Sequence, residues 1–321
     1  MKLGVFTVLF GGSKSFEPML DLVSELGVEA VEIGTGAYPG NAYCNPGELL
    51  ENRSRLGAFR EAISRRGLTI SAFSCHGNPL HPQRERAKAD HEVFLQTLEL
   101  AKALEVSTVI TFSGCPGGDP QATGPNWIVS PWPPEFSQML EWQWRERVLP
   151  YWADAAKSAR DAGVKVAIEM HPNFVAYHPE SMSRLREIAP GTIGCNFDPS
   201  HMIWQQVDVV SAIRALGDSI LHVHAKDCRI DRANTMRNGV LDSKKYTSEL
   251  ERSWIFRTVG YGSDELFWKD LISNLRLVGY DHVISIEHED SLMSSGEGLR
   301  KAIAFLKPLL IAEPAGEAYW S

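Results

Sequence analysis

The sequence lacks the features that mark disulfide-rich, zinc-knuckle and membrane-spanning proteins. Its five cysteines are an odd number with no Cys-x-x-Cys spacing, so neither a disulfide framework nor a structural zinc site is expected. No apolar run approaches the roughly 18 residues that a membrane span needs, and the run at residues 3–10 is too short for a signal-peptide core. We therefore expect reduced thiols in a cytoplasmic protein with no membrane contact.

Positive charge is also scarce. The chain has 32 Lys and Arg against 40 Asp and Glu, which gives a formal net charge of -8, and no stretch gathers basic residues into a stripe. Proteins that bind nucleic acid use clustered Lys and Arg to displace counterions from phosphates. The composition therefore argues against a nucleic-acid partner.

The most regular feature of the sequence is an eightfold alternation of short apolar runs and longer amphipathic stretches, which is typical of parallel strands joined by helices. The expected strands are residues 2–10, 30–34, 69–75, 108–113, 165–171, 193–201, 220–227 and 282–290. The expected helices are residues 16–26, 53–66, 84–104, 144–162, 179–188, 207–216, 264–277 and 296–310. The first strand is not followed by the G-x-G-x-x-G of a dinucleotide-binding sheet. The pattern predicts an α/β fold, a (β/α)8 TIM barrel, as a single domain over residues 1–321.

Two connections are longer than usual, residues 115–143 after the fourth strand and residues 228–262 after the seventh. Both follow strands, so both belong to the barrel face on which active sites are built. The first contains Trp127, Trp132 and Trp142, and Trp144 follows it directly. These rings could stack on a sugar or aglycone, or could pack the lid or a subunit interface.

Metal-binding side chains crowd the ends of the last four strands. Side chains alternate along a strand, so residues that flank outward-facing apolar positions point to the barrel axis. By this criterion, the side chains expected to point inward are those of Glu169, His171, Asp198, His222, His224, Lys226, Glu287 and Glu289. Buried charges need a counter-ion, and a set of three carboxylates with one imidazole suits Mn²⁺ or Mg²⁺ and tolerates Co²⁺ or Zn²⁺. We expect one divalent ion, with Mn²⁺ favoured.

These segments resemble the xylose-isomerase-like barrels of the sugar phosphate isomerase/epimerase group. The resemblance is most specific in Ile-Glu-Met-His-Pro at 168–172, Asn-Phe-Asp-Pro-Ser-His at 196–201, His-Val-His-Ala-Lys-Asp at 222–227 and Ser-Ile-Glu-His-Glu-Asp at 285–290. It implies that Glu169, Asp198, His224 and Glu287 are the metal ligands. It also implies that His201 contacts the substrate.

The resemblance further implies proton abstraction next to a carbonyl, with the metal stabilising the resulting enediolate. Glu169 and Glu287 would then be the base and its conjugate-acid partner, and His171 is an alternative base. Substrate hydroxyls are expected at His76 and His201. Lys226 and Asp227 would orient His224 or substrate oxygens, and Arg229 is a further substrate-binding candidate.

The residues after His224 bear on which branch of the family the sequence resembles. Ketose 3-epimerases carry an Arg six positions beyond the His ligand, where this chain has Ile230, and the stretch from His224 to Arg229 is closer to the His-x-Lys-Asp-x-Arg of inosose dehydratases. We predict an isomerase or epimerase of a sugar or keto-sugar. The alternative is a lyase or dehydratase acting by β-elimination on a keto-sugar, cyclitol or 3-keto-glycoside.

Two other functional classes share part of this pattern. A metallonuclease of the endonuclease-IV type shares the barrel but needs an Asp-x-His after the seventh strand, which this chain lacks, and a His at the end of the fourth, where Ser113 stands. A helper subunit of a hetero-oligomer is also possible, although the complete ligand set argues against a dead site. A homo-oligomer is compatible with the sequence, which carries no assembly signature.

Overall fold

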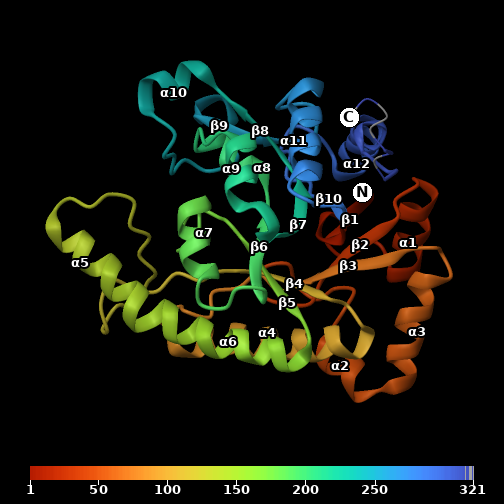
Figure 1. The fold of residues 1–321 in the computed structure, drawn as a ribbon, viewed down its shortest axis with the longest axis horizontal. Coiled ribbons are helices and arrows are strands. Elements are labelled where there is room, and N and C mark those ends of the chain that lie inside the picture. Colours follow the sequence, from red (N-terminus) through yellow and green to blue (C-terminus); the bar gives the residue numbers. More distant parts are fainter. Residues whose placement is uncertain (315, 318–319, 321) are drawn as a thin grey trace.

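Eight parallel strands close into a barrel in the computed structural model, which describes residues 1–314, 316–317 and 320 (Figure 1). Around the barrel the strands follow the order β1, β10, β7, β6, β5, β4, β3, β2. Their bounds are β1 Lys2–Phe6, β2 Ala30–Gly34, β3 Thr69–Ser74, β4 Thr108–Phe112, β5 Lys165–Glu169, β6 Ile193–Phe197, β7 Ile220–Ala225 and β10 Val283–Ile286. The predicted (β/α)8 barrel is therefore confirmed.

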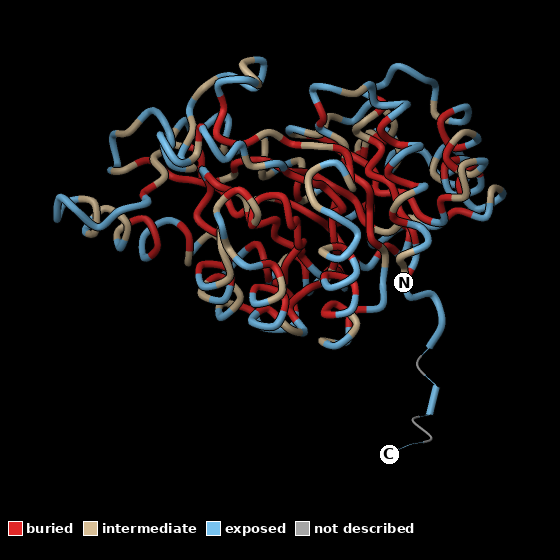
Figure 2. The backbone as a smooth tube through the Cα atoms, turned by 90° about the horizontal axis from the view of Figure 1, so that it is seen from above, coloured by how far each residue is buried: buried red, intermediate tan, exposed pale blue. Residues whose placement is uncertain are grey.

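Helices cover the outside of the barrel. They are α1 Phe16–Glu25, α2 Pro46–Glu51, α3 Arg53–Ser64, α4 Arg84–Leu104, α5 Pro134–Trp142, α6 Leu149–Ala162, α7 Pro179–Arg186, α8 Pro199–Trp204, α9 Val209–Leu216, α10 Arg232–Asn238, α11 Glu265–Leu277 and α12 Ser295–Leu306. A turn of π-helix, Gln143–Val148, leads into α6. The main core lies between the helices and the outward faces of the strands, where the tube in Figure 2 is mostly red. No helix in the described part of the chain is long and apolar enough to cross a membrane.

Several strands end sooner than the apolar runs predicted. The run at residues 193–201 forms a strand only to Phe197, because Asp198 then caps the short helix α8. Asp198 Oδ1 accepts a hydrogen bond from the Ser200 backbone N–H at 2.8 Å, and Pro199 occupies the first helical position, where its missing N–H costs nothing. Asp198 therefore stands just beyond the end of β6.

The two long connections lie where the sequence places them, after β4 and β7, but they are not irregular loops. The first carries α5, which projects from the molecule in Figure 1. The second folds into a small antiparallel sheet of β8 Asp227–Ile230 and β9 Trp254–Arg257, with α10 between the two strands. An ordered hairpin therefore borders the carboxyl ends of β6 and β7.

Candidate active site

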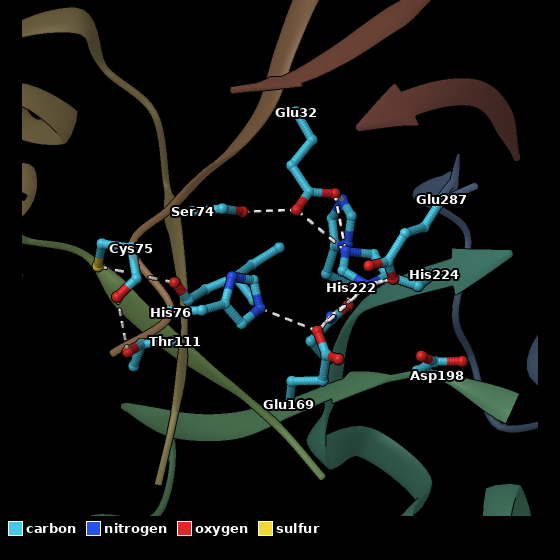
Figure 3. Close-up of polar contacts among 12 residues, drawn as sticks. Glu32, Ser74, Cys75, His76, Thr111, Glu169, Asp198, His222, His224 and Glu287 are labelled. Carbon is cyan, nitrogen blue, oxygen red and sulfur yellow. Dashed lines mark hydrogen bonds and ion pairs between the residues drawn. The ribbon is translucent and has the colours of Figure 1, made fainter. Parts of the chain in front are cut away.

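Four strand ends bring three carboxylates and one imidazole together. Glu169 ends β5, Asp198 follows β6, His224 lies in β7 and Glu287 follows β10, and all four are buried. One ligand atom from each lies within 4.8 Å of the others. That spacing is close to that of atoms about 2.2 Å from a common ion. Figure 3 shows the four side chains directed toward one point.

The environment of two carboxylate oxygens fits a bound cation. Asp198 Oδ2 and Glu287 Oε2 are buried and accept no well-directed hydrogen bond from the residues that the structure describes. Each lies at ion-pair distance from the Lys226 ammonium, at 2.9 Å and 3.1 Å respectively. Lys226 offsets only part of the negative charge of the three clustered carboxylates, so a further cation would be stabilised there. The four residues can therefore hold a divalent metal ion.

The two ring nitrogens of His224 face different partners. Nδ1 lies 2.9 Å from Glu287 Oε2 and 3.2 Å from Glu169 Oε2, whereas Nε2 lies 2.9 Å from Glu32 Oε2. Nδ1 is therefore the atom available to a metal, and Nε2–H donates to Glu32. Burial disfavours the charged ring, but the Glu32, Glu287 and Glu169 carboxylates outweigh it and raise the pKa of His224 well above its usual range. In this arrangement one carboxylate fixes the tautomer of a metal-binding histidine.

Glu32 is a site residue that the sequence reasoning missed. It lies in β2 and is fully buried, and it also accepts a hydrogen bond from the Ser74 hydroxyl (Figure 3). Burial raises the pKa of Glu32, but the His224 imidazole more than compensates and the net pKa is lowered. The signal was present, since a single acid between Val31 and Ile33 must face the barrel interior when those two residues face the helices.

Glu169 is held by groups on three sides. Its Oε2 lies 2.9 Å from His76 Nε2 and accepts a hydrogen bond from Asn196 Nδ2 at 3.0 Å. Burial opposes ionisation, but the His224 and His76 imidazoles outweigh it and hold the pKa of Glu169 well below its usual range. His201 Nε2 lies 3.5 Å from Glu169 Oε1. The structure thus places both predicted substrate histidines beside the predicted base.

Lys226 reaches into the same cluster. Its ammonium lies 2.9 Å from Asp198, 3.1 Å from Glu287 and 3.3 Å from Glu289. Burial alone would lower the pKa of Lys226, but these three carboxylates raise it well above its usual value. Lys226 is therefore a fixed positive charge next to Glu287.

His171 lies at the edge of the cluster with its ring 4.2 Å from that of His201 and 4.9 Å from that of Phe112. Burial, reinforced by the neighbouring His201, lowers the pKa of His171 to about 3. Such a ring stays neutral at physiological pH and is a weak proton acceptor. The pKa of Glu169 is lowered as well, so pKa does not separate the two candidate bases; Glu169 differs from His171 in belonging to the four-residue cluster.

Asp227 and Arg229 are not brought into the cluster. Arg229 is exposed and donates to the Gly262 carbonyl at 3.2 Å. The Asp227 carboxylate is buried and accepts hydrogen bonds from backbone N–H groups at distances of 2.9 to 3.1 Å, those of Cys228, Gly260, Gly262 and Ser263. A Cβ at Gly262 would lie 2.5 Å from Asp227 Oδ1, so this close approach needs glycine. Asp227 anchors the turn that follows β9.

Replacing Asp227 with alanine should lower the free energy of unfolding by about 3 kcal/mol, because several buried N–H groups lose a charged acceptor together. Urea denaturation measures this loss. The matched change Asp231→Ala removes a helix cap at α10, where Oδ1 accepts from Asn234 at 2.8 Å, and should cost about 1 kcal/mol. A fully stable Asp227→Ala protein that has lost turnover would instead make Asp227 a substrate residue.

A cavity of about 140 Å³ lies directly over the cluster. Its walls include Phe6, Tyr38, His76 and Phe112, and its floor carries Glu169, Lys226 and Glu287. We call it the catalytic pocket. Its apolar walls with a few convergent charges are typical of small-molecule sites.

The tryptophans singled out in the sequence divide between several environments. Trp132 is 73% exposed, and Trp144 is buried with the Arg184 guanidinium 4.3 Å from its ring. Trp127 is the member of this set that lines a cavity next to the catalytic pocket. Trp204 of α8 and Trp254 of β9, from other parts of the chain, line the same cavity. Within this cavity, Trp127 is therefore the one tryptophan of the first long connection that could offer a stacking surface.

Residues 20–309 match the family model described as the xylose isomerase-like TIM barrel. The chain belongs to this family. The xylose isomerase-like barrel predicted from the strand-end motifs is therefore confirmed. A relative within it is the uncharacterized protein YfiH of Bacillus subtilis, 38% identical over 310 residues that cover 96% of this chain and 98% of YfiH.

Solved structures share the fold at low identity. The probable 3-DHS dehydratase AsbF of Bacillus anthracis has a TM-score of 0.67 at 16% identity, over 96% of this chain and 99% of AsbF. The IolI protein, solved with a zinc atom, has a TM-score of 0.65 at 17% identity, over 96% of each chain. The 3-keto-D-glucoside 4-epimerase YcjR of E. coli has a TM-score of 0.63 at 15% identity, over 96% of this chain and 99% of YcjR. Structural neighbours of this xylose isomerase-like barrel thus include an epimerase and a dehydratase.

Proposed function

We propose that the protein is a divalent-metal-dependent isomerase or epimerase of a sugar or keto-sugar, which removes a proton from the carbon next to a carbonyl. The observation that carries this proposal is the convergence of Glu169, Asp198, His224 and Glu287 within 4.8 Å, at the floor of a pocket. The structural neighbour YcjR, whose name describes a 3-keto-D-glucoside 4-epimerase, supports this class of substrate and reaction.

We further propose Mn²⁺ as the ion, because three hard oxygen ligands with one imidazole suit it, while Mg²⁺, Co²⁺ and Zn²⁺ also fit such a set. The zinc atom in IolI supports a divalent ion in this fold. When bound, the ion would act as a Lewis acid toward the carbonyl and the adjacent hydroxyl.

The side chains then divide the proton transfers between them. Glu169 is ionised, as a base must be, and takes the proton from carbon. Glu287 is the proposed conjugate-acid partner, and the Lys226 ammonium lies 3.1 Å from its carboxylate. His76 and His201 bind substrate hydroxyls beside the base.

Elimination is the second candidate, and a specific observation favours it. The catalytic pocket adjoins a larger cavity across His171, so a leaving group attached to the sugar has somewhere to go. Elimination begins with the same proton abstraction as isomerisation, and the two reactions differ in whether a C–O bond then breaks.

Solvent exchange distinguishes the two reactions. In D₂O, an isomerase or epimerase should place deuterium at the carbon next to the carbonyl while the substrate keeps all its substituents, whereas a lyase should release the substituent or water. We expect NMR to detect deuterium uptake with Mn²⁺-loaded protein, and no uptake after chelation. Equal exchange rates in the loaded and chelated protein would contradict the proposal.

A further inference from the structure

Of the cavities that share a lining residue with the catalytic pocket, one has several aromatic rings in its wall. It measures about 330 Å³, against about 140 Å³ for the catalytic pocket, and His171 lies in the wall of both. Pockets that enclose drug-sized ligands have volumes of about 300–1,000 Å³. The catalytic pocket alone falls below that range, so it has room for one small ring, and the adjoining cavity has room for a second group.

The walls of the adjoining cavity are aromatic and mutually braced. The rings of Trp204 and Trp254 stack at 4.6 Å with an angle of 8° between their planes, and Tyr246 stacks on Phe256 at 5.8 Å. The Arg252 guanidinium lies 4.4 Å from the Tyr246 ring and 4.5 Å from that of Trp254. These contacts hold flat apolar faces in place before any ligand arrives. We call this cavity the aromatic pocket.

The aromatic pocket also carries polar groups that have no partner. Trp127 Nε1, Trp204 Nε1 and His201 Nδ1 are buried and make no hydrogen bond to any residue that the structure describes. Trp204 and His201 are 5% and 1% exposed, so solvent does not satisfy them. Buried indole N–H groups usually find an acceptor. A ligand with a flat ring would supply a stacking partner, and a rotation of these side chains toward the pocket would bring their nitrogens to its oxygen substituents.

We infer that the substrate has two parts, a keto-sugar unit over the metal-binding cluster and an oxygen-substituted aromatic group in the aromatic pocket. The inference rests on the proposed function for the sugar half, and on the aromatic pocket alone for the other half. His171 stands between the two, where the bond that joins them would lie. The substrate class is thus an oxidised aryl glycoside, and free monosaccharides would use only half of the site.

Calorimetry with two probes tests this inference without turnover. The probes are 4-nitrophenyl β-D-glucopyranoside and methyl β-D-glucopyranoside, titrated into chelated protein and into Mg²⁺-loaded protein. We expect the aryl glycoside to bind at least about ten-fold more tightly than the methyl glycoside in both states, since ring stacking and burial do not need the metal. Equal affinities for the two probes would overturn the inference.

Variants locate the binding site. Tyr246→Ala and Trp254→Leu should each remove most of the preference for the aryl glycoside, while Trp132→Ala, at an exposed ring outside the pocket, should leave it unchanged. Tyr246 is 55% exposed, so its replacement tests the pocket even if Trp254→Leu fails to fold. An aryl preference that survives Tyr246→Ala in folded protein would contradict the inference. An aryl preference without turnover of any keto-sugar would sink the proposed function alone, and turnover without an aryl preference would sink the two-part substrate alone.

Discussion

Replacing Glu169 with glutamine is expected to lower kcat/KM by at least about 10³-fold, because the amide can neither accept the substrate proton nor bind a cation as a carboxylate does. The change keeps the size of the side chain, and the amide can still contact Asn196 and His76, which lie 3.0 Å and 2.9 Å from Oε2. Folding should therefore survive. Steady-state kinetics on a keto-sugar at saturating Mn²⁺ would measure the loss of turnover with the ion supplied in excess.

Two further variants make this result specific. Glu141→Gln changes a glutamate that is 64% exposed and paired with Arg184 at the surface, so it should have wild-type kinetics. His171→Gln should cost less than Glu169→Gln, since His171 lies outside the proposed ligand set. A larger loss in His171→Gln than in Glu169→Gln would reverse the assignment of the base.

Replacing Glu32 with glutamine should weaken metal binding about 10- to 100-fold, although Glu32 is not itself a ligand. Its two oxygens lie 3.0 Å and 2.9 Å from His224 Nε2 and keep Nδ1 turned toward Glu169 and Glu287. A neutral amide withdraws the charge that favours this tautomer and orientation. Titration of Mn²⁺ against a competing chelator measures the change in affinity.

The control for Glu32 is Glu105→Gln, which alters an acid that is 84% exposed at the end of α4. It should bind the ion as the wild type does. Folded Glu32→Gln protein with unaltered Mn²⁺ affinity would show that His224 needs no carboxylate behind it, and would remove Glu32 from the site.

The sequence predicted the barrel well because each strand and helix is encoded locally. The eight apolar runs fall on the eight barrel strands. The helix predicted at residues 84–104 is α4, with the same bounds. Strand ends were less predictable, since the residues that follow Phe6 enter a turn of 3-10 helix and those that follow Phe197 enter α8. Whether a buried apolar residue continues a strand depends on caps such as Asp198 more than on hydrophobicity.

The site was predictable where alternation along one strand decides which way a side chain points. That argument brought Glu169, Asp198, His224 and Glu287 to one place, but it was applied only to the last four strands and so missed Glu32. It could not show that the Asp227 carboxylate accepts hydrogen bonds from the loop after β9, because those contacts depend on loop conformation. The same limit hid the aromatic pocket, whose facing rings at positions 204 and 254 lie far apart in the sequence.

Metal content tests the central claim most directly. Protein equilibrated with Mn²⁺ and freed of excess ion should hold about one ion per chain by elemental analysis, and Asp198→Ala should hold almost none, since one carboxylate of the proposed ligand set is lost. Wild-type protein that retains no divalent ion, with turnover unaffected by chelators, would contradict the account.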